Sequence, residues 1–414
     1  MKVAVIGLGK LGLPLAALLA TSGNEVLGFD LSSSQRKLIG SGAFDFKEPR
    51  LNELLFSSKE TLTIVDSIAE AIQDVELVFV IVPTPSMPSG EFTNEFVINA
   101  LNEIGTAIAG SNKRIVIDIV STVMPNSCAG ELSEALEVSS GRKIGEDLGL
   151  CYNPEFIALG SVIHDMEYPD MHLIGQSSVW AGELVEITLK SITRREVPTR
   201  RMSLTEAELV KIAVNNFVTM KISYANMLFQ AALTLDDVNI DTVTNAIGLD
   251  SRIGTKYLRA AAPYGGPCFP RDTRALSSLY KGLGLADSLS EATDVANKNH
   301  TAFVARYIRE QSVKNAKIGI CGISYKTGTQ VIEESPGLAI GRLLTKEGYE
   351  IRFWDDEDAT PFESEKIFYP ESSAESLVSN VDFVVITRPL NDAREFYEIL
   401  NKFKKPYLDL WRQG

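Results

Sequence analysis

Uninterrupted apolar runs divide the first part of the chain into regular units. Residues 2–6 form one such run, which ends at Gly7 and is followed by an apolar helical stretch through Ala20. Further runs occur at residues 25–30, 75–82, 114–120 and 148–152. Runs of this kind are typical of parallel strands that are buried on both faces. Their alternation with helical segments predicts a doubly wound α/β sheet.

The last third of the chain repeats this pattern. Apolar runs occur at residues 316–321, 350–354, 381–387 and 405–410. The first of these runs leads into Gly322, and the second leads into Asp355. The pattern predicts a second βαβ domain, although its loops differ in length from those of the first.

The segment between the two predicted domains favours helices. Ser203 and Glu206 form a capping box, in which each side chain can accept from the other residue's backbone N–H. Neither proline nor glycine follows before Leu235, and apolar residues recur at every third or fourth position. This predicts a helix of about 30 residues, which would act as a connector, a dimer interface or both.

Together the patterns predict two Rossmann-like doubly wound parallel-sheet domains joined by a helical middle domain with a long central helix. We expect an N-terminal domain at residues 1–200, the helical domain at 201–300 and a C-terminal domain at 301–414.

Composition limits the kinds of partner. The 414 residues include 40 Lys and Arg and 54 Asp and Glu, which gives a net charge of −14. This balance argues against a nucleic-acid-binding face and against a polybasic membrane surface. The longest apolar stretches fall short of the roughly 20 residues of a membrane helix. Four scattered cysteines without a CxxC pair, and only three histidines, predict a cytoplasmic protein without a metal site.

The first chemical motif is the turn that contains Gly7, Gly9 and Gly12. This GxGxxG spacing follows a predicted strand and opens a helix, as in dinucleotide-binding turns. Asp30 ends the next strand, where a carboxylate accepts from the ribose 2′-hydroxyl and repels a 2′-phosphate. We therefore predict NAD rather than NADP as the cofactor, although the neighbouring cations Arg36 and Lys37 count the other way.

The second motif is the loop at residues 264–272, with the sequence YGGPCFPRD. Two glycines and two prolines around Cys268 predict a rigid loop with an approachable thiol. Arg271 would favour the thiolate, and Asp272 would handle protons. A buried structural cysteine is the alternative interpretation.

Two further segments carry polar residues at positions suited to catalysis. Glu155 follows a predicted strand, where a carboxylate can act as a base, although a surface glutamate is the simpler interpretation. Lys211 and Asn215 are four residues apart and therefore lie on one face of the long helix. A solvated lysine is the ordinary alternative at that position.

These segments together resemble the UDP-glucose/GDP-mannose dehydrogenase family over essentially the whole chain. The similar segments are GLGKLG (7–12), VPTP (82–85), STVMP (121–125), NPEF (153–156), AELVKIAVNNF (207–217), residues 252–254, GGPCFPRD (265–272) and YKTGT (325–329). Their common order argues against a chance match. Within the family, the segment NPEFIALGS is more similar to the UDP-glucose branch than to the branches that act on N-acetylmannosamine derivatives.

The resemblance implies a four-electron oxidation of the C6 alcohol of a nucleotide sugar. Cys268 would form a thiohemiacetal and then a thioester. Lys211 would stabilise the oxyanion with Asn215 as a hydrogen-bond partner, and Asp272 would activate or relay water. Glu155 would be the general base of hydrolysis. Thr122 would lie near the cofactor and an ordered water.

The resemblance also implies the binding residues. NAD would be bound by Gly7, Leu8, Gly9, Lys10, Leu11, Gly12, Asp30, Val82, Pro83, Thr84, Ser121 and Thr122. The nucleotide sugar would be bound by Glu155, Phe156, Lys211, Asn215, Arg252, Tyr257, Tyr264, Gly265, Gly266 and Lys326. The C-terminal domain would hold the nucleotide diphosphate. The long helix would form the core of a homodimer or a higher assembly, in which Arg252 reaches the neighbouring site.

Several positions depart from the family pattern. Leu159 stands where the family has a second glutamate, and Glu333 replaces an arginine. Gln330 and Val331 replace two acids of the same segment. Arg271 replaces a lysine, which keeps the cation. A substrate-binding arginine near the C-terminus is matched only loosely, by Arg412.

Other functions remain open at this point. A sister 6-dehydrogenase would oxidise GDP-mannose or a UDP-N-acetylhexosamine. A two-electron β-hydroxyacid dehydrogenase would need neither the cysteine nor the second sheet domain. A non-catalytic nucleotide-sugar-binding protein is suggested by Leu159 and Glu333, but the set of predicted catalytic residues argues against it.

Overall fold

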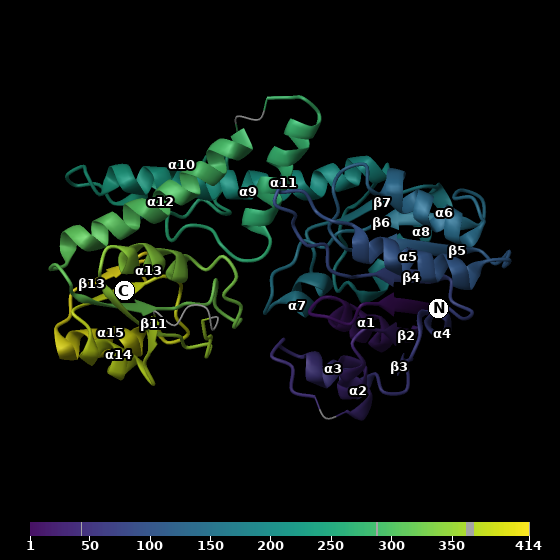
Figure 1. The fold of residues 1–414 in the computed structure, drawn as a ribbon, viewed down its shortest axis with the longest axis horizontal. Helices are drawn as coiled ribbons and strands as arrows, with labels where there is room; N and C mark the ends of the chain where they lie inside the picture. Colours follow the sequence, from purple (N-terminus) through teal and green to yellow (C-terminus); the bar gives the residue numbers. More distant parts are fainter. Residues whose placement is uncertain (43, 287–288, 362–367, 414) are drawn as a thin grey trace. The chain divides into compact units, whose positions relative to one another are not determined.

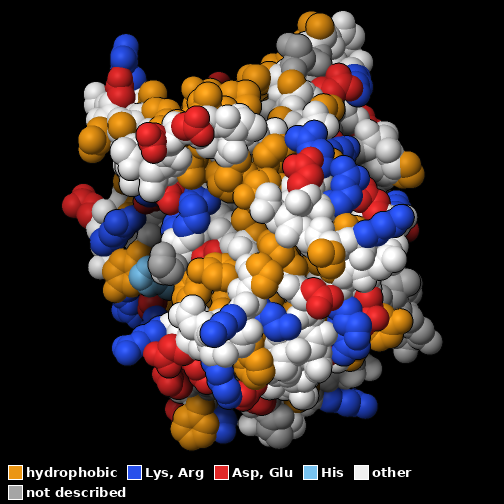
Figure 2. Space-filling view, turned by 90° about the vertical axis from the view of Figure 1, so that its left-hand side faces the viewer, with side chains coloured by type: hydrophobic (Ala, Val, Ile, Leu, Met, Phe, Trp, Pro, Cys, Tyr) orange, Lys and Arg blue, Asp and Glu red, His pale blue; other side chains and the backbone are white. Residues whose placement is uncertain are grey.

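The computed structural model describes residues 1–42, 44–286, 289–361 and 368–413 (Figure 1). The chain forms two compact units, Met1–Ala213 and Val214–Gly414. Each unit contains its own sheet and its own buried core. On the face shown in Figure 2, acidic and basic side chains are interspersed, and hydrophobic side chains gather between them.

The sheet of the first unit has eight strands in the order β3-β2-β1-β4-β5-β6-β7-β8. They are β1 (Lys2–Ile6), β2 (Glu25–Phe29), β3 (Leu62–Ile64), β4 (Leu77–Val80), β5 (Ile115–Ile119), β6 (Leu148–Tyr152), β7 (His172–Gln176) and β8 (Thr199–Met202). Strands β1 to β6 are parallel, as the apolar runs predicted. Strand β7 is antiparallel to β6 and parallel to β8, an addition that the sequence pattern did not reveal.

Helices cover both faces of this sheet. They are α1 (Gly12–Thr21), α2 (Ser33–Ser41), α3 (Leu51–Ser57), α4 (Ile68–Ala71), α5 (Glu95–Ile108), the π-helical turn η1 (Cys128–Leu132), α6 (Ser133–Ser140), α7 (Val162–Glu167) and α8 (Val179–Ile192). Two apolar clusters fill the space between sheet and helices, one with α1 and α8 and one with α5 and α6. Nine residues of α1 are buried, which explains its apolar sequence.

The sheet of the second unit has the order β11-β10-β9-β12-β13, and its strands are all parallel. They are β9 (Lys317–Cys321), β10 (Glu350–Trp354), β11 (Phe368–Pro370), β12 (Phe383–Ile386) and β13 (Tyr407–Asp409). The helices α13 (Pro336–Lys346), α14 (Ala374–Asn380) and α15 (Ala393–Phe403) alternate with these strands. The predicted fold class, with two doubly wound sheets and helices between them, is confirmed.

The helices between the two sheets are α9 (Leu204–Ala232), α10 (Ile240–Gly248), α11 (Phe269–Gly282) and α12 (Leu289–Gln311). Helix α9 has 29 residues, as predicted, and the boundary between the two units falls within it. Its capping box is present, because the Ser203 N–H donates to Glu206 Oε2 at 2.8 Å and the Glu206 N–H donates to Ser203 Oγ at 3.3 Å. In the described ranges, the helices are too short or too polar to cross a membrane.

The first turn after the opening strand is built alike in both sheets. Gly7 follows β1 with φ 96°, and Gly322 follows β9 with φ 91°. In each turn the amide of the next residue donates to the acid that ends the neighbouring strand. The distances are 2.8 Å to Asp30 in the first unit and 2.6 Å to Asp355 in the second.

The two acids differ in their surroundings. Asp30 is half-buried, whereas Asp355 is buried and pairs with a guanidinium. That guanidinium belongs to Arg388, which is 1% exposed and donates to Asp355 at 2.9 Å and also to Asp356. The Ser324 N–H donates to Asp355 as well, at 2.8 Å. The carboxylate of the second turn is therefore occupied by groups of the protein itself.

Candidate functional site

The glycine turn of the first unit lies directly before α1 and is open on one side, at Gly9. A Cβ atom at Gly7 would lie 2.1 Å from the backbone oxygen of Ile81, and one at Gly12 would lie 1.8 Å from the oxygen of Gly7. These two glycines permit close packing of backbone on backbone. Gly9 differs, because a Cβ there would meet nothing within 4 Å. Its open side is where a pyrophosphate can approach backbone N–H groups at a helix N-terminus.

This contrast gives a matched pair of variants. We expect Gly7→Ala to lower the free energy of unfolding by about 3 kcal/mol, because it adds a clash and strains a left-handed backbone. We expect Gly9→Ala to change that free energy by less than about 0.5 kcal/mol but to raise the Kd of NAD at least tenfold. Urea unfolding and calorimetric titration measure the two effects. Unchanged NAD binding by Gly9→Ala would contradict the placement of the pyrophosphate.

Asp30 lies at the position expected for a ribose-binding acid. Its carboxylate accepts from the Leu8 N–H and from the Ser32 N–H, both at 2.8 Å. These bonds orient the carboxylate, and its oxygens keep lone pairs for further donors. The open glycine turn and the half-exposed acid together fit an adenine dinucleotide without a 2′-phosphate, which is NAD.

Two loops with predicted cofactor residues are hydrogen-bonded to each other at the ends of β4 and β5. Ser121 Oγ donates to the Val82 oxygen at 2.7 Å and accepts from the Val82 N–H at 2.9 Å. Thr84 Oγ1 donates to the Thr122 oxygen at 2.7 Å. The structure thus brings these predicted residues together on one edge of the sheet. Pro83 lies between them in the first loop.

Glu208 holds the second of these loops, and the sequence-based prediction missed it. Its carboxylate accepts from the N–H groups of Asn126 and Cys128 at 2.6 and 2.7 Å. Glu208 is fully buried and lies one helical turn before Lys211 on α9. The sequence feature that could have revealed it is its spacing: Glu208 lies four residues from both Leu204 and Ile212 and therefore on their apolar face of the helix, where an acid is unusual.

Glu155 lies in the loop after β6. Nζ of Lys211 donates to the backbone oxygen of Glu155 at 2.7 Å and lies 4.8 Å from the centroid of the Phe156 ring. Burial raises the pKa of Glu155 to about 7, the charge of Lys211 opposes this rise, and the charge of Asp165 adds to it. A carboxyl group with this pKa can take up and release a proton near neutral pH.

Lys211 and Asn215 are 7% and 8% exposed. The alternative interpretation of Lys211 as a solvated lysine is therefore wrong. Leu159, at the position of the missing glutamate, packs against the apolar cluster that contains α1. Its side chain thus adds apolar contact where an acid was expected.

Cys268 immediately precedes α11 in the second unit. Of the four cysteines it alone is exposed, while Cys128, Cys151 and Cys321 are buried. Helix α11 has 14 residues, so its N-terminus favours a negative charge on the adjoining thiol. The alternative of a buried structural cysteine is therefore wrong for Cys268.

The glycines before Cys268 allow close packing of the loop. A Cβ at Gly265 would lie 2.2 Å from the backbone oxygen of Glu334, and one at Gly266 would lie 2.4 Å from the ring of Tyr325. Gly266 also has φ 81°. Burial and the nearby Cys268 raise the pKa of Tyr325. The cysteine loop is thus fitted against the segment that follows β9.

Polar partners fix both ends of this loop. At its start, the Tyr264 N–H donates to Asn297 Oδ1 at 2.8 Å, and Asn297 Nδ2 donates to the Tyr264 oxygen at 2.9 Å. At its end, Asn215 Nδ2 donates to Asp272 Oδ2 at 2.6 Å, while Arg271 Nε pairs with Asp272 Oδ1 at 3.3 Å. Asp272 is 1% exposed. The structure therefore brings together Asn215 and Asp272, two of the predicted site residues.

Three other predicted residues are exposed or half-buried. Arg252 is exposed and pairs with Asp250 at 2.6 Å. Tyr257 is 52% exposed and packs edge-on against Phe269, with 6.2 Å between the ring centroids. Lys326 is half-buried in the loop after β9.

Arg412, the loose match to a substrate-binding arginine, pairs with an acid of the second unit. Its Nε and Nη2 each donate to the carboxylate of Asp241 at 2.7 Å, and its guanidinium lies 5.2 Å from the centroid of the Phe229 ring. Arg412 thus ties the C-terminal segment to α10 and α9.

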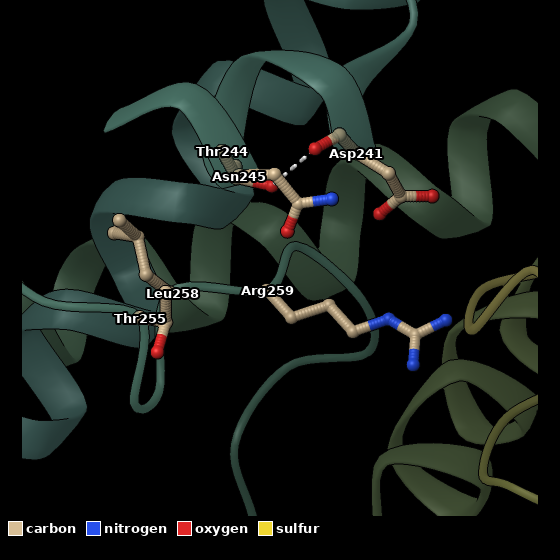
Figure 3. Close-up of a pocket in the computed structure, with 6 residues that line it drawn as sticks. All are labelled: Asp241, Thr244, Asn245, Thr255, Leu258 and Arg259. Carbon is tan, nitrogen blue, oxygen red and sulfur yellow. Dashed lines mark hydrogen bonds between the residues drawn. The ribbon is translucent and has the colours of Figure 1, made fainter. Parts of the chain in front are cut away.

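A polar cavity of about 330 Å³ opens beside α10 (Figure 3). It is lined by Asp241, Thr244, Asn245, Thr255, Leu258 and Arg259. None of the predicted site residues lines this cavity, and the carboxylate of Asp241 is already engaged by Arg412.

The comparisons with known proteins agree with this geometry. Three models of the UDP-glucose/GDP-mannose dehydrogenase family match in order: the NAD binding domain at 1–192, the central domain at 205–299 and the UDP binding domain at 319–411. GDP-mannose 6-dehydrogenase of Pseudomonas aeruginosa is 29% identical, over 86% of this chain and 81% of its own length. UDP-glucose 6-dehydrogenase of Rickettsia bellii is 27% identical, over 99% of this chain and 94% of its own.

A solved structure is also similar. The UDP-glucose dehydrogenase of Pyrobaculum islandicum superposes with a TM-score of 0.87 at 27% identity, covering 99% of this chain and 97% of its own. The fold and the glycine turn define an NAD-binding oxidoreductase. The chain belongs to the UDP-glucose/GDP-mannose dehydrogenase family, which comprises NAD-dependent nucleotide-sugar 6-dehydrogenases.

Proposed function

We propose that this enzyme oxidises the C6 primary alcohol of UDP-glucose to the carboxylate of UDP-glucuronate. The observation that carries the proposal is Cys268, an exposed thiol at the start of α11 in a chain whose other three thiols are buried. Such a thiol can hold the sugar covalently between two oxidations. The match to a UDP binding domain and the similarity to UDP-glucose 6-dehydrogenases support uridine and glucose.

GDP-mannose is the second candidate substrate, because the Pseudomonas aeruginosa relative that acts on it is 29% identical. That relative is matched over 86% of this chain, whereas the Rickettsia bellii enzyme is matched over 99%. The fuller match favours UDP-glucose.

The proposed reaction has three steps. In the first oxidation C6 loses a hydride and its hydroxyl loses a proton, which gives the aldehyde. The Cys268 thiolate adds to the carbonyl carbon, and the thiohemiacetal loses a second hydride and proton to become a thioester. Water then attacks the thioester carbonyl, the C–S bond breaks, and the carboxylate and the thiol are released. NAD, when bound, accepts the hydride in each oxidation.

The remaining catalytic roles follow from charge and protonation. Lys211 is a buried cation, so we assign it to the oxyanion at C6, with Asn215 as a hydrogen-bond donor one turn further along α9. Asp272, held by Asn215 at 2.6 Å, would relay a proton from water. Glu155, with its raised pKa, would be the general base of hydrolysis. Thr122 would orient water on the cofactor side.

Substrate contacts form the next part of the proposal. We assign sugar contacts to Phe156, Tyr264, Gly265 and Gly266, and nucleotide contacts to Tyr257 and Lys326. We also propose that residues 1–200 bind NAD, that 201–300 carry the cysteine loop and the dimer interface, and that 301–414 bind the nucleotide sugar.

We further propose a homodimer through α9. Phe217, Tyr224 and Met227 are 59%, 47% and 53% exposed and recur at spacings of seven and three residues, so they form one apolar stripe. Arg252, whose side chain is 85% exposed, would reach the partner's site. Sedimentation equilibrium at micromolar concentration tests this, and a monomer there would contradict it.

The stoichiometry of NADH tests the proposed function. Limiting amounts of UDP-glucose, GDP-mannose, dTDP-glucose and UDP-N-acetylglucosamine are each oxidised to completion with excess NAD. We expect two NADH per UDP-glucose and the highest kcat/KM for that sugar. One NADH per sugar would indicate a two-electron dehydrogenase. A higher kcat/KM for GDP-mannose would replace UDP-glucose as the substrate, and the absence of NADH with every sugar would overturn the enzymatic role.

A further inference from the structure

Arg36 lies beside the predicted ribose-binding acid, and the proposed function gives it no role. It is on α2, six residues after Asp30, and its guanidinium lies 5.3 Å from the centroid of the Phe29 ring at the end of β2. An arginine in this position after the second strand is the group that accommodates a ribose 2′-phosphate in NADP-binding sheets. The chain therefore carries both the acid that excludes this phosphate and a cation suited to bind it.

The guanidinium of Arg36 is held by acceptors of the protein. Nη1 donates to the backbone oxygens of Asp30 and Leu31 at 2.6 and 3.3 Å. Nε pairs with Asp66 Oδ1 at 3.3 Å. The side chain of Arg36 is only 16% exposed, whereas that of Asp66 is 90% exposed. The counter-ion is thus a solvent-exposed carboxylate in the loop between β3 and α4.

The acids near Arg36 oppose the binding of a ribose 2′-phosphate to its guanidinium. The Arg36 guanidinium pairs with the carboxylate of Asp66 and donates to the backbone oxygen of Asp30, whose own carboxylate carries a second negative charge. A 2′-phosphate at this position would therefore meet two acids against one cation. The Arg36–Asp66 pair itself is exposed on one side and contributes little to stability. Replacing Asp66 therefore releases the cation at little cost to the fold.

We propose that Arg36 is a latent binding group for a ribose 2′-phosphate, and that Asp66 acts with Asp30 to exclude the phosphorylated cofactor. Asp66 is thereby a specificity-determining residue. The inference rests on the assignment of Asp30 to the cofactor ribose in the proposed function.

A gain of NADP binding tests this inference. The full-length variants are Asp30→Ser, Asp66→Asn and the double variant, each titrated calorimetrically with NAD, NADP and 2′-phospho-ADP-ribose. We expect Asp30→Ser to weaken NAD binding at least about tenfold, because it loses charge-assisted hydrogen bonds to the ribose. We expect the double variant to bind NADP and 2′-phospho-ADP-ribose at least about tenfold more tightly than Asp30→Ser does. Its kcat/KM ratio for NADP over NAD should rise in parallel.

Two neighbouring cations provide matched controls. Arg36→Met, added to the double variant, should abolish the gain, whereas Lys37→Met on the exposed side of α2 should leave it within about twofold. A gain that depends on Lys37 rather than Arg36 would overturn the inference. So would the lack of any gain in a double variant that melts like the parent.

The controls also separate the two levels of the argument. If Asp30→Ser binds NAD as tightly as the parent, the proposed placement of the ribose fails. If Asp30→Ser loses NAD binding but Asp66→Asn adds no NADP binding, only the role of Arg36 and Asp66 fails.

Discussion

Replacing Cys268 by alanine is expected to lower kcat for formation of the carboxylate by at least about 10³-fold, the range found when a catalytic nucleophile is removed. The reason is chemical rather than structural. The thiol is exposed at the N-terminus of α11, and its loss removes the group that captures the aldehyde. We expect at most one NADH per sugar in this variant, with the aldehyde detectable by a hydrazine reagent.

Cys321→Ala is the matched control, because this thiol is buried in β9 and has no assigned role. It should retain kcat within about threefold, although it loses some stability through the cavity it creates. Iodoacetamide should modify Cys268 faster than the three buried thiols, and the nucleotide sugar should protect it. Two NADH per sugar at the parental rate from Cys268→Ala would exclude the covalent mechanism.

Replacing Glu155 by glutamine should block the reaction at a later step. The two oxidations precede hydrolysis, so we expect a rapid burst of two NADH per active site followed by turnover that is about 10² to 10⁴-fold slower. The stalled thioester should react with hydroxylamine to give a hydroxamate of the sugar. Steady turnover at the parental rate without a burst would show that another group is the base.

The pH dependence of kcat gives a second measure of Glu155. A general base works in its deprotonated form, so kcat should rise with pH through the Glu155 pKa of about 7. Because the charge of Lys211 lowers this pKa, Lys211→Met should move the rising limb of the kcat–pH curve to higher pH in addition to lowering kcat. The limb should be absent from the slow turnover of Glu155→Gln. A limb that stays at the same pH in Lys211→Met would contradict the assignment.

Much of the fold was predictable from the sequence because local patterns determine it. The runs at 2–6 and 148–152 correspond residue for residue to β1 and β6, because buried parallel strands need apolar residues on both faces. The run at 350–354 corresponds to β10, in which buried Ile351 and Phe353 alternate with half-buried residues. Elsewhere the strands are shorter than the runs, as for β4 at Leu77–Val80. The flanking apolar residues there continue into loops that are themselves buried or half-buried.

The candidate site was predictable where a spacing encodes the chemistry. The glycine turn, Asp30 and the Lys211–Asn215 pair each follow from distances along one turn, strand or helix. Pairings between distant residues were not predictable. Glu208 accepts from residues about 80 positions away, and Arg412 pairs with an acid 171 positions away. A charged residue in the sequence looks the same whether its partner is water or a buried backbone amide.

The turn after β9, in which Asp355 is hydrogen-bonded by groups of the protein itself, has a consequence for ligand design. Both sheets present an acid at the end of the second strand, but in the second unit this acid already accepts hydrogen bonds from the buried Arg388 guanidinium and from the Ser324 N–H. Among the described residues, Asp30 is therefore the strand-end acid at which we expect a compound that imitates adenosine to bind. Competitive inhibitors built on adenosine should act against the cofactor alone, and inhibitors aimed at the nucleotide sugar need a different scaffold.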